Sequence, residues 1–211
     1  MRIRAGAKIL FQGDSITNAF RMPREINHAY QMGAGYAMIL AAHLLSRRPA
    51  DGLTFVNRGV SGDGLAKMAD RWREDCLDLK PDVLSILVGV NDTVGCSRRK
   101  DGYSVAAFGA RYRELLAETR RALPRVQVIL CEPFGAPCGT MTPAMIADVT
   151  ERGREVRRIA AETGAVFVPF GSAFRRAFHK APPEYWAYDG IHATAAGFGL
   201  MVAAWLRAVR P

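Results

Sequence analysis

The chain has 211 residues and a mass of 23.1 kDa, a length that predicts a single domain over residues 1–211. Its 49% hydrophobic and 23% charged residues are ordinary for a globular protein, which excludes collagen, a coiled coil and full-length disorder. No apolar run approaches the roughly 20 residues of a membrane helix, and Ile9–Phe11 is too short for a secretory signal. We therefore expect a cytoplasmic protein, or a mature form without its signal.

The net charge of +9 makes nucleic acid a partner to be considered. The positive residues, however, come as scattered pairs such as Arg47-Arg48 and Arg120-Arg121, mostly on or beside expected helices. Solvated helix faces explain such pairs, and no nucleic-acid-binding signature accompanies them, so we expect no nucleic-acid partner. The same faces leave pairing with a second subunit open.

The cysteines form no C-x-x-C pair and lie near no histidine cluster. We expect reduced, mostly buried thiols and no metal site for Cys76, Cys96, Cys131 and Cys138.

Short apolar runs alternate with longer helical patterns along the chain. Unbroken apolar strands indicate burial on both faces, as in a parallel sheet. Alternating strands and helices then predict a three-layer, doubly wound α/β domain. The expected strands are Lys8–Gln12, Thr54–Arg58, Val83–Val88, Gln127–Glu132 and Ala165–Pro169. The expected helices are Tyr36–Arg47, Leu65–Leu77, Val105–Leu123, Pro143–Thr163 and Ala195–Val209.

Four polar, glycine-containing segments interrupt this apolar pattern, and three of them directly follow a strand. Ligands of open parallel sheets bind at the carboxyl ends of the strands, so we expect these segments to converge on one edge. They are Gly13–Thr17, Asn57–Asp63, Gly89–Asp92 and Asp189–His192.

The convergent segments carry the groups of nucleophilic catalysis. Ser15 needs an adjacent base to become a nucleophile, and His192 is the best candidate. Asp189 lies three residues before His192, a spacing that lets its carboxylate reach one imidazole nitrogen. The backbone N–H groups of Ser15 and Gly62 and the side-chain amide of Asn91 are candidate donors of an oxyanion hole.

Each segment also has an ordinary structural interpretation. Gly13–Ser15 alone is a common turn, Asn91-Asp92 suits a helix N-cap, and Asp189-Gly190 is a frequent turn dipeptide. Ser61 is a rival nucleophile in a glycine-flanked loop. The joint occurrence of the four segments, in order, favours catalysis.

Taken together, the motifs closely resemble the SGNH superfamily of GDSL-type esterases and lipases over nearly the whole chain. The resemblance implies a flavodoxin-like α/β/α sandwich with a five-stranded parallel sheet, forming one SGNH hydrolase domain over residues 1–211. It also implies Ser15 as nucleophile, Gly62 and Asn91 as further oxyanion donors, and Asp189 and His192 as the rest of the triad. No cofactor is implied. Asn18 stands where many relatives have aspartate, and Ala193 replaces the proline that commonly follows the histidine.

Within the superfamily the chain is most similar to intracellular carbohydrate acetylesterases, especially those that deacetylate xylo-oligosaccharides. We expect a serine esterase that removes O-acetyl groups through an acyl-serine intermediate, with no membrane partner. A lipase, lysophospholipase or thioesterase for longer acyl chains is the alternative, and a catalytically silent carbohydrate-binding protein is the non-enzymatic one. We expect Asp14, Tyr185 and Trp186 to contact substrate; for the two rings, packing beneath the C-terminal loop is an equal alternative. The stretches that carry this similarity are Leu10–Thr17, Gly33–Leu44, Arg71–Asp92 and Tyr185–His192.

Overall fold

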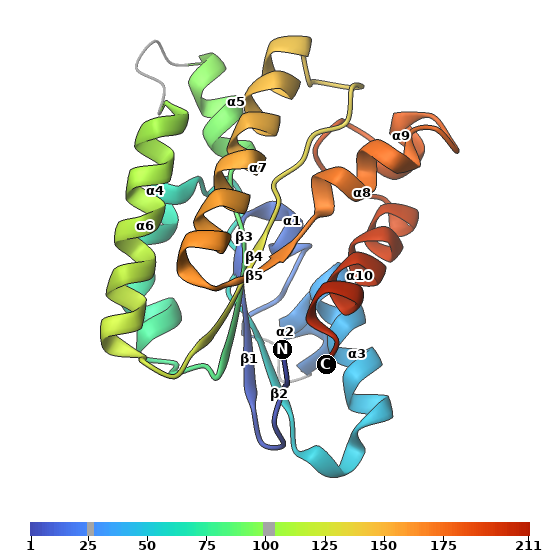
Figure 1. Cartoon of the computed structure of the whole chain (residues 1–211). Coiled ribbons are helices and arrows are strands. Elements are labelled where there is room, and N and C mark those ends of the chain that lie inside the picture. The colour runs from blue at the N-terminus through green and yellow to red at the C-terminus, as the bar shows by residue number, and fades with distance from the viewer. Residues whose placement is uncertain (25–27, 99–103) are drawn as a thin grey trace.

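Five parallel strands form a single sheet in the order β2-β1-β3-β4-β5, the flavodoxin-like arrangement of a doubly wound fold. The structure is a computed structural model that describes residues 1–24, 28–98 and 104–211, with the backbone alone described for 96–98. Figure 1 shows the sheet between two layers of helices, which confirms the expected three-layer α/β/α sandwich. The strands are β1 Lys8–Gly13, β2 Thr54–Asn57, β3 Val83–Leu87, β4 Gln127–Cys131 and β5 Val166–Val168.

The longer helices divide between the two faces of the sheet. On one face lie α3 (Tyr36–Arg47), α8 (Phe170–Ala177) and α10 (Ala195–Val209). On the other lie α4 (Leu65–Asp70), α6 (Val105–Ala122) and α7 (Pro143–Thr163). The remaining helical segments are α1 (Ser15–Asn18), α2 (His28–Met32), α5 (Val90–Arg98), α9 (Pro183–Trp186), the 3₁₀ turn η1 (Pro49–Asp51) and the π-helical turn η2 (Arg73–Leu77).

The central strand β3 shows why the apolar runs are unbroken. All five of its residues are buried, and alternate side chains point to opposite faces of a strand. Val83 and Leu87 therefore belong to the core under α3 and α10, while Leu84 and Ile86 belong to the core under α6 and α7. The polar Ser85 is accommodated because its Oγ accepts a 3.2 Å hydrogen bond from Trp205 Nε1.

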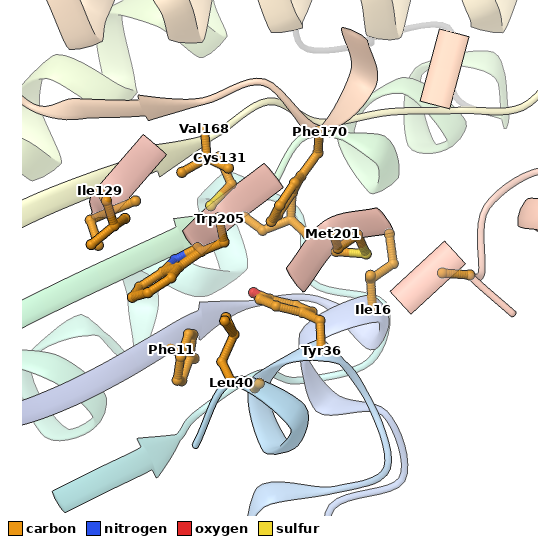
Figure 2. Packing of buried hydrophobic residues seen from close by; sticks show 14 of the residues in the cluster. Phe11, Ile16, Tyr36, Leu40, Ile129, Cys131, Val168, Phe170, Met201 and Trp205 are labelled. Carbon is orange, nitrogen blue, oxygen red and sulfur yellow. The ribbon is translucent and has the colours of Figure 1, made fainter. Parts of the chain in front are cut away.

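The core under α3 and α10 extends to the carboxyl edge of β1 (Figure 2). Tyr36 lies edge-on to Phe11 and Phe170, with ring centroids 5.8 and 5.7 Å apart, and its hydroxyl is 3.0 Å from Thr17 Oγ1. Ile16, in the same cluster, is only 2% exposed. Two residues of the short helix α1 are thus anchored in the core, which holds the neighbouring Ser15 in place.

One expected helix is broken. The apolar pattern predicts a helix over Leu65–Leu77, but α4 ends at Asp70 and η2 starts at Arg73. Buried Gln12 donates a 2.7 Å hydrogen bond from Nε2 to the Asp75 carbonyl, which lies within η2, where the backbone follows the wider π-helical path.

Among the described helices, none combines the length and the apolar character needed to span a bilayer. Cys76 and Cys131 are buried free thiols and Cys138 is a half-buried one. The side chain of Cys96 lies outside the described residues.

Candidate active site

Hydrogen bonds join the four polar segments at the carboxyl edge of the sheet. The backbone N–H of Val60 donates to the Gly13 carbonyl at 2.9 Å, which ties the segment after β2 to the segment after β1. Asn91 Nδ2 donates to the Asp63 carbonyl at 3.0 Å, which brings in the segment after β3. His192, from the loop between α9 and α10, lies against Ser15 and completes the convergence predicted from the sequence.

Ser15 is presented by a one-turn helix that begins where β1 ends. Asp14, the N-cap of α1, has extended backbone angles (φ −98°, ψ −151°), and its Oδ1 accepts the backbone N–H of Ile16 at 2.9 Å. With Ile16 buried below, Ser15 is half-buried at the first position of the helix. The seryl hydroxyl therefore points away from the core, at the edge of the sheet.

Ser15, His192 and Asp189 form a continuous hydrogen-bonded chain. Ser15 Oγ lies 2.8 Å from His192 Nε2, and His192 Nδ1 lies 2.7 Å from Asp189 Oδ2. When Nδ1 donates to the carboxylate, Nε2 is left free to accept the seryl proton. This is the geometry in which a serine hydroxyl is activated by a neighbouring base.

The Asp189 carboxylate is held by the turn in which it lies. Its Oδ1 accepts the backbone N–H groups of His192 at 2.7 Å and of Ile191 at 3.0 Å. Partial burial raises the pKa of Asp189, but these hydrogen bonds and the one from the imidazole outweigh it, so the pKa lies below its usual value. The carboxylate stays charged beside the imidazole and stabilises its protonated form.

A second loop, residues 136–140, holds the Asp189 turn from outside. The Ala136 N–H donates to the Gly190 carbonyl at 2.8 Å, and the Thr140 N–H donates to the Asp189 carbonyl at 3.1 Å. Gly139 has φ +58°, and a Cβ placed there would collide with the Asp189 backbone. The close approach of these two loops therefore requires glycine at this position.

The three candidate oxyanion donors have N–H groups available. Gly62 is exposed with φ +83°, and among the described residues its N–H and that of Ser15 have no acceptor. Asn91 uses one amide hydrogen on Asp63, the residue after Gly62, and keeps a second one. The Asn91 amide thus lies beside the loop that carries Gly62. The same loop is joined to the segment of Ser15 by the hydrogen bond between Val60 and Gly13.

Arg71, which sequence reasoning did not single out for a role, organises the loop that carries Gly62. Its guanidinium contacts the carboxylates of Asp63 and Asp75 at 2.7 Å each and the Arg58 carbonyl at 2.9 Å. A planar guanidinium with five fixed donors can connect several acceptors at once. Apart from the i,i+4 pair with Asp75, no local sequence pattern predicts this role, because the other partners lie in the loop after β2 and in β1.

Asp14 does not occupy the substrate-contacting position expected for it. Its side chain is 1% exposed, so it lies beneath the site and acts as a helix cap. Its Oδ2 is buried without a hydrogen-bond partner among the described residues. Burial raises the pKa of Asp14 to about 7, against the lowering effect of the Ile16 N–H.

The expected aromatic pair lies on α9. The rings of Tyr185 and Trp186 meet edge-to-face with centroids 5.0 Å apart, Trp186 packs against the core, and Tyr185 is exposed. Among the described residues neither ring stacks on His192. The aromatic ring that does contact the imidazole is Tyr188, which sequence reasoning missed although it directly precedes Asp189.

The rival serine and the two departures from the family pattern also have defined places. Ser61 is exposed, and among the described residues the hydroxyl bonded to His192 is that of Ser15. Asn18 Nδ2 donates to the Gly59 carbonyl at 3.0 Å, a bond that a carboxylate could not donate. Ala193 forms an antiparallel bridge with Ala187, and Thr194 caps α10 through a 3.2 Å bond from the Gly197 N–H, as expected for a helix N-cap.

Over residues 1–24, 28–98 and 104–211, no group of three histidine, cysteine or acidic side chains is placed to hold a metal ion.

Comparison with known proteins agrees with this geometry. Residues 11–200 match the GDSL-like Lipase/Acylhydrolase family. An acetylxylan esterase from Geobacillus stearothermophilus is 33% identical over 216 residues, which cover 99% of this chain and 96% of that protein.

Two crystal structures illustrate the likeness in three dimensions. A GDSL-like lipase from Parabacteroides merdae, 36% identical, superposes with a TM-score of 0.94 over 99% of this chain and 98% of that one. The Geobacillus stearothermophilus acetylxylan esterase Axe2, 32% identical, superposes with a TM-score of 0.89 over 99% and 96% of the two chains. The chain thus belongs to the GDSL-like lipase/acylhydrolase family and is a carboxylic ester hydrolase.

Proposed function

We propose that Ser15 is the nucleophile of a two-step serine esterase. His192 removes the hydroxyl proton as Ser15 Oγ attacks the ester carbonyl, and Asp189 stabilises the imidazolium that forms. The protonated His192 then gives the proton to the departing alkoxide, which leaves an acyl group on Ser15. The observation that carries the proposal is the hydrogen-bonded chain of 2.8 and 2.7 Å from Ser15 through His192 to Asp189.

The negative charge of both tetrahedral intermediates falls on the former carbonyl oxygen. In this proposal the N–H groups of Ser15 and Gly62 and the second amide hydrogen of Asn91 donate to that oxygen. Their support is that the first two N–H groups have no acceptor among the described residues and that Asn91 is tied to the Gly62 loop. Water, deprotonated by His192, then attacks the acyl-Ser15 and releases the acid. These steps use no cofactor.

We propose further that the substrate is a short-chain acyl ester, with O-acetylated oligosaccharides of the xylan type as the first candidates. Relatives support this choice: one that aligns over nearly the full length is an acetylxylan esterase, and a variant structure of it is described as an acetyl-xylooligosaccharide esterase. A serine, a histidine and an aspartate variant of the same enzyme are each described as catalytic mutants. The proposed partner is thus an oligosaccharide ester, with no nucleic acid and no membrane.

Two measurements on the purified protein test this function. Acetate release from acetylated xylo-oligosaccharides is compared with hydrolysis of p-nitrophenyl esters of increasing acyl length. We expect acetate release, and we expect the hydrolysis rate of the p-nitrophenyl esters to be highest at about two to four acyl carbons. A maximum at about C8 or longer, without acetate release, contradicts the acetylesterase proposal and supports the lipase or thioesterase alternative.

Ser15→Ala is the control for contaminating esterases. Loss of the nucleophile should lower turnover by about 10³-fold or more. Near-normal activity of Ser15→Ala would contradict the assignment, and an inactive wild-type protein would favour the silent binding protein.

A further inference from the structure

We propose that Tyr188 is a specificity-determining residue that binds the leaving group of the ester, an inference that rests on the proposed function. Its ring lies nearly parallel to the His192 imidazole, with centroids 6.0 Å apart and an interplanar angle of 21°. The same tyrosine is 61% exposed. One face of the ring therefore contacts the catalytic imidazole while the rest is open to a substrate.

The backbone holds Tyr188 in this position. Its N–H donates to the His192 carbonyl at 3.2 Å, next to the antiparallel bridge between Ala187 and Ala193. Tyr188 and His192 thus face each other across the small loop that carries Asp189. These backbone contacts fix the Tyr188 backbone relative to that of His192.

The reaction geometry assigns the alcohol side of the ester to this region. His192 must donate the proton from Nε2 to the leaving alkoxide oxygen, so that oxygen lies within hydrogen-bond reach of the imidazole. In the proposed mechanism the carbonyl oxygen of the acyl group lies instead toward the donors at Gly62 and Asn91. The aromatic surface next to His192 therefore meets the leaving group, not the acyl group.

The exposed ring fits a sugar better than a small alcohol. A pyranose presents an apolar face of C–H groups, and an aromatic face is a large rigid surface that binds it at low cost in conformational entropy. The ring face, which lies nearly parallel to the imidazole, carries the proposed contact. Tyr185, also exposed at 55%, packs on Trp186 and has no such contact with His192.

The decisive experiment compares two acetate esters that differ only in the leaving group. Acetylated xylobiose offers a sugar face, whereas ethyl acetate has a leaving group too small to cover the ring. We expect Tyr188→Ala to lower kcat/KM for acetylated xylobiose by about five- to tenfold, mainly through KM, and to leave kcat/KM for ethyl acetate within about twofold. Tyr188→Phe should behave as wild type, and Tyr30→Ala, which removes an equally exposed ring on α2, should change neither value. Tyr185→Ala tests the other exposed ring that the sequence suggests as a substrate contact.

Other results overturn the inference. An equal loss on both esters with a shifted pH profile means that Tyr188 acts on His192 rather than on substrate, and unchanged kinetics on both means that it does neither. A loss of kcat/KM for acetylated xylobiose alone in Tyr185→Ala would assign the sugar-binding ring to Tyr185 on α9 instead. Wild-type protein that hydrolyses neither ester overturns the proposed function together with this inference, whereas an active wild type confines the failure to Tyr188.

Discussion

The buried carboxyl group of Asp14 makes the stability of the protein depend on pH in a direction opposite to that of most aspartates. Its pKa is raised from 3.8 to about 7 by burial, so between these values the unfolded chain is ionised while the folded protein holds the proton. The stability that the neutral carboxyl contributes is complete below about pH 3.8 and is lost as the pH rises through about 7. At about 1.4 kcal/mol for each pKa unit, the loss approaches about 4 kcal/mol.

Asp14→Asn removes this charge and keeps an oxygen that can accept the Ile16 N–H. The amide Nδ2 would take the place of Oδ2, which has no partner among the described residues, at a cost of about 1–3 kcal/mol that does not vary with pH. The pH dependence is therefore the decisive quantity. We expect the free energy of unfolding of Asp14→Asn, minus that of wild type, to be about 2–3 kcal/mol higher (more stabilising) at pH 8 than at pH 5.

Urea unfolding of both proteins at the two pH values measures this difference. Asp70→Asn, a substitution at an exposed aspartate, controls for the change in net charge. A difference between Asp14→Asn and wild type that is the same at pH 5 and pH 8, or that is larger at pH 5, refutes the reasoning.

Three further predictions concern the groups that build the site. Asn91→Ala should lower kcat by about 10²–10³-fold on p-nitrophenyl acetate, as loss of an oxyanion donor does, and a loss confined to KM would argue against that role. Gly139→Ala should lower kcat more than Gly164→Ala, because both have φ near +60° but only at Gly139 does a Cβ meet the Asp189 backbone; equal losses would show backbone strain alone. Arg71→Lys keeps the positive charge but loses the planar guanidinium that contacts Asp63 and Asp75 at the same time, so kcat should fall by about tenfold while the far-ultraviolet circular dichroism stays unchanged. Full activity of Arg71→Lys would show that the loop carrying Gly62 does not need the guanidinium.

The parts of the fold that the sequence predicts to the residue are those with local signals. Helix α7 begins at Pro143 after a Thr142 cap and ends at Gly164 in the left-handed conformation, and both signals are visible in the sequence. The five strands were found within one or two residues, because burial on both faces leaves continuous apolar runs.

What the sequence did not predict depends on contacts between distant residues. The change from α4 to η2 is one example: η2 is contacted by Gln12 of β1 through a bond to Asp75 that spans 63 residues, and no pattern within residues 65–77 predicts it. The burial of Asp14 likewise follows from packing around the end of β1, which a Gly-Asp-Ser motif does not encode.

The site shows the same division. Ser15, His192 and Asp189 were predicted together because motif identity and strand-end positions are local, and the structure places them within hydrogen-bond distance. Tyr188 was missed because an exposed aromatic residue acquires a role only through the loop geometry that lays it on the imidazole.

Active-site labelling followed by mass spectrometry tests the nucleophile most directly. A fluorophosphonate should add once to the wild-type protein, with the peptide containing Ser15 carrying the adduct, and should react slowly with His192→Ala and not at all with Ser15→Ala. An adduct on Ser61, or undiminished labelling of Ser15→Ala, would contradict the claim that the hydroxyl hydrogen-bonded to His192 is the one that attacks the ester.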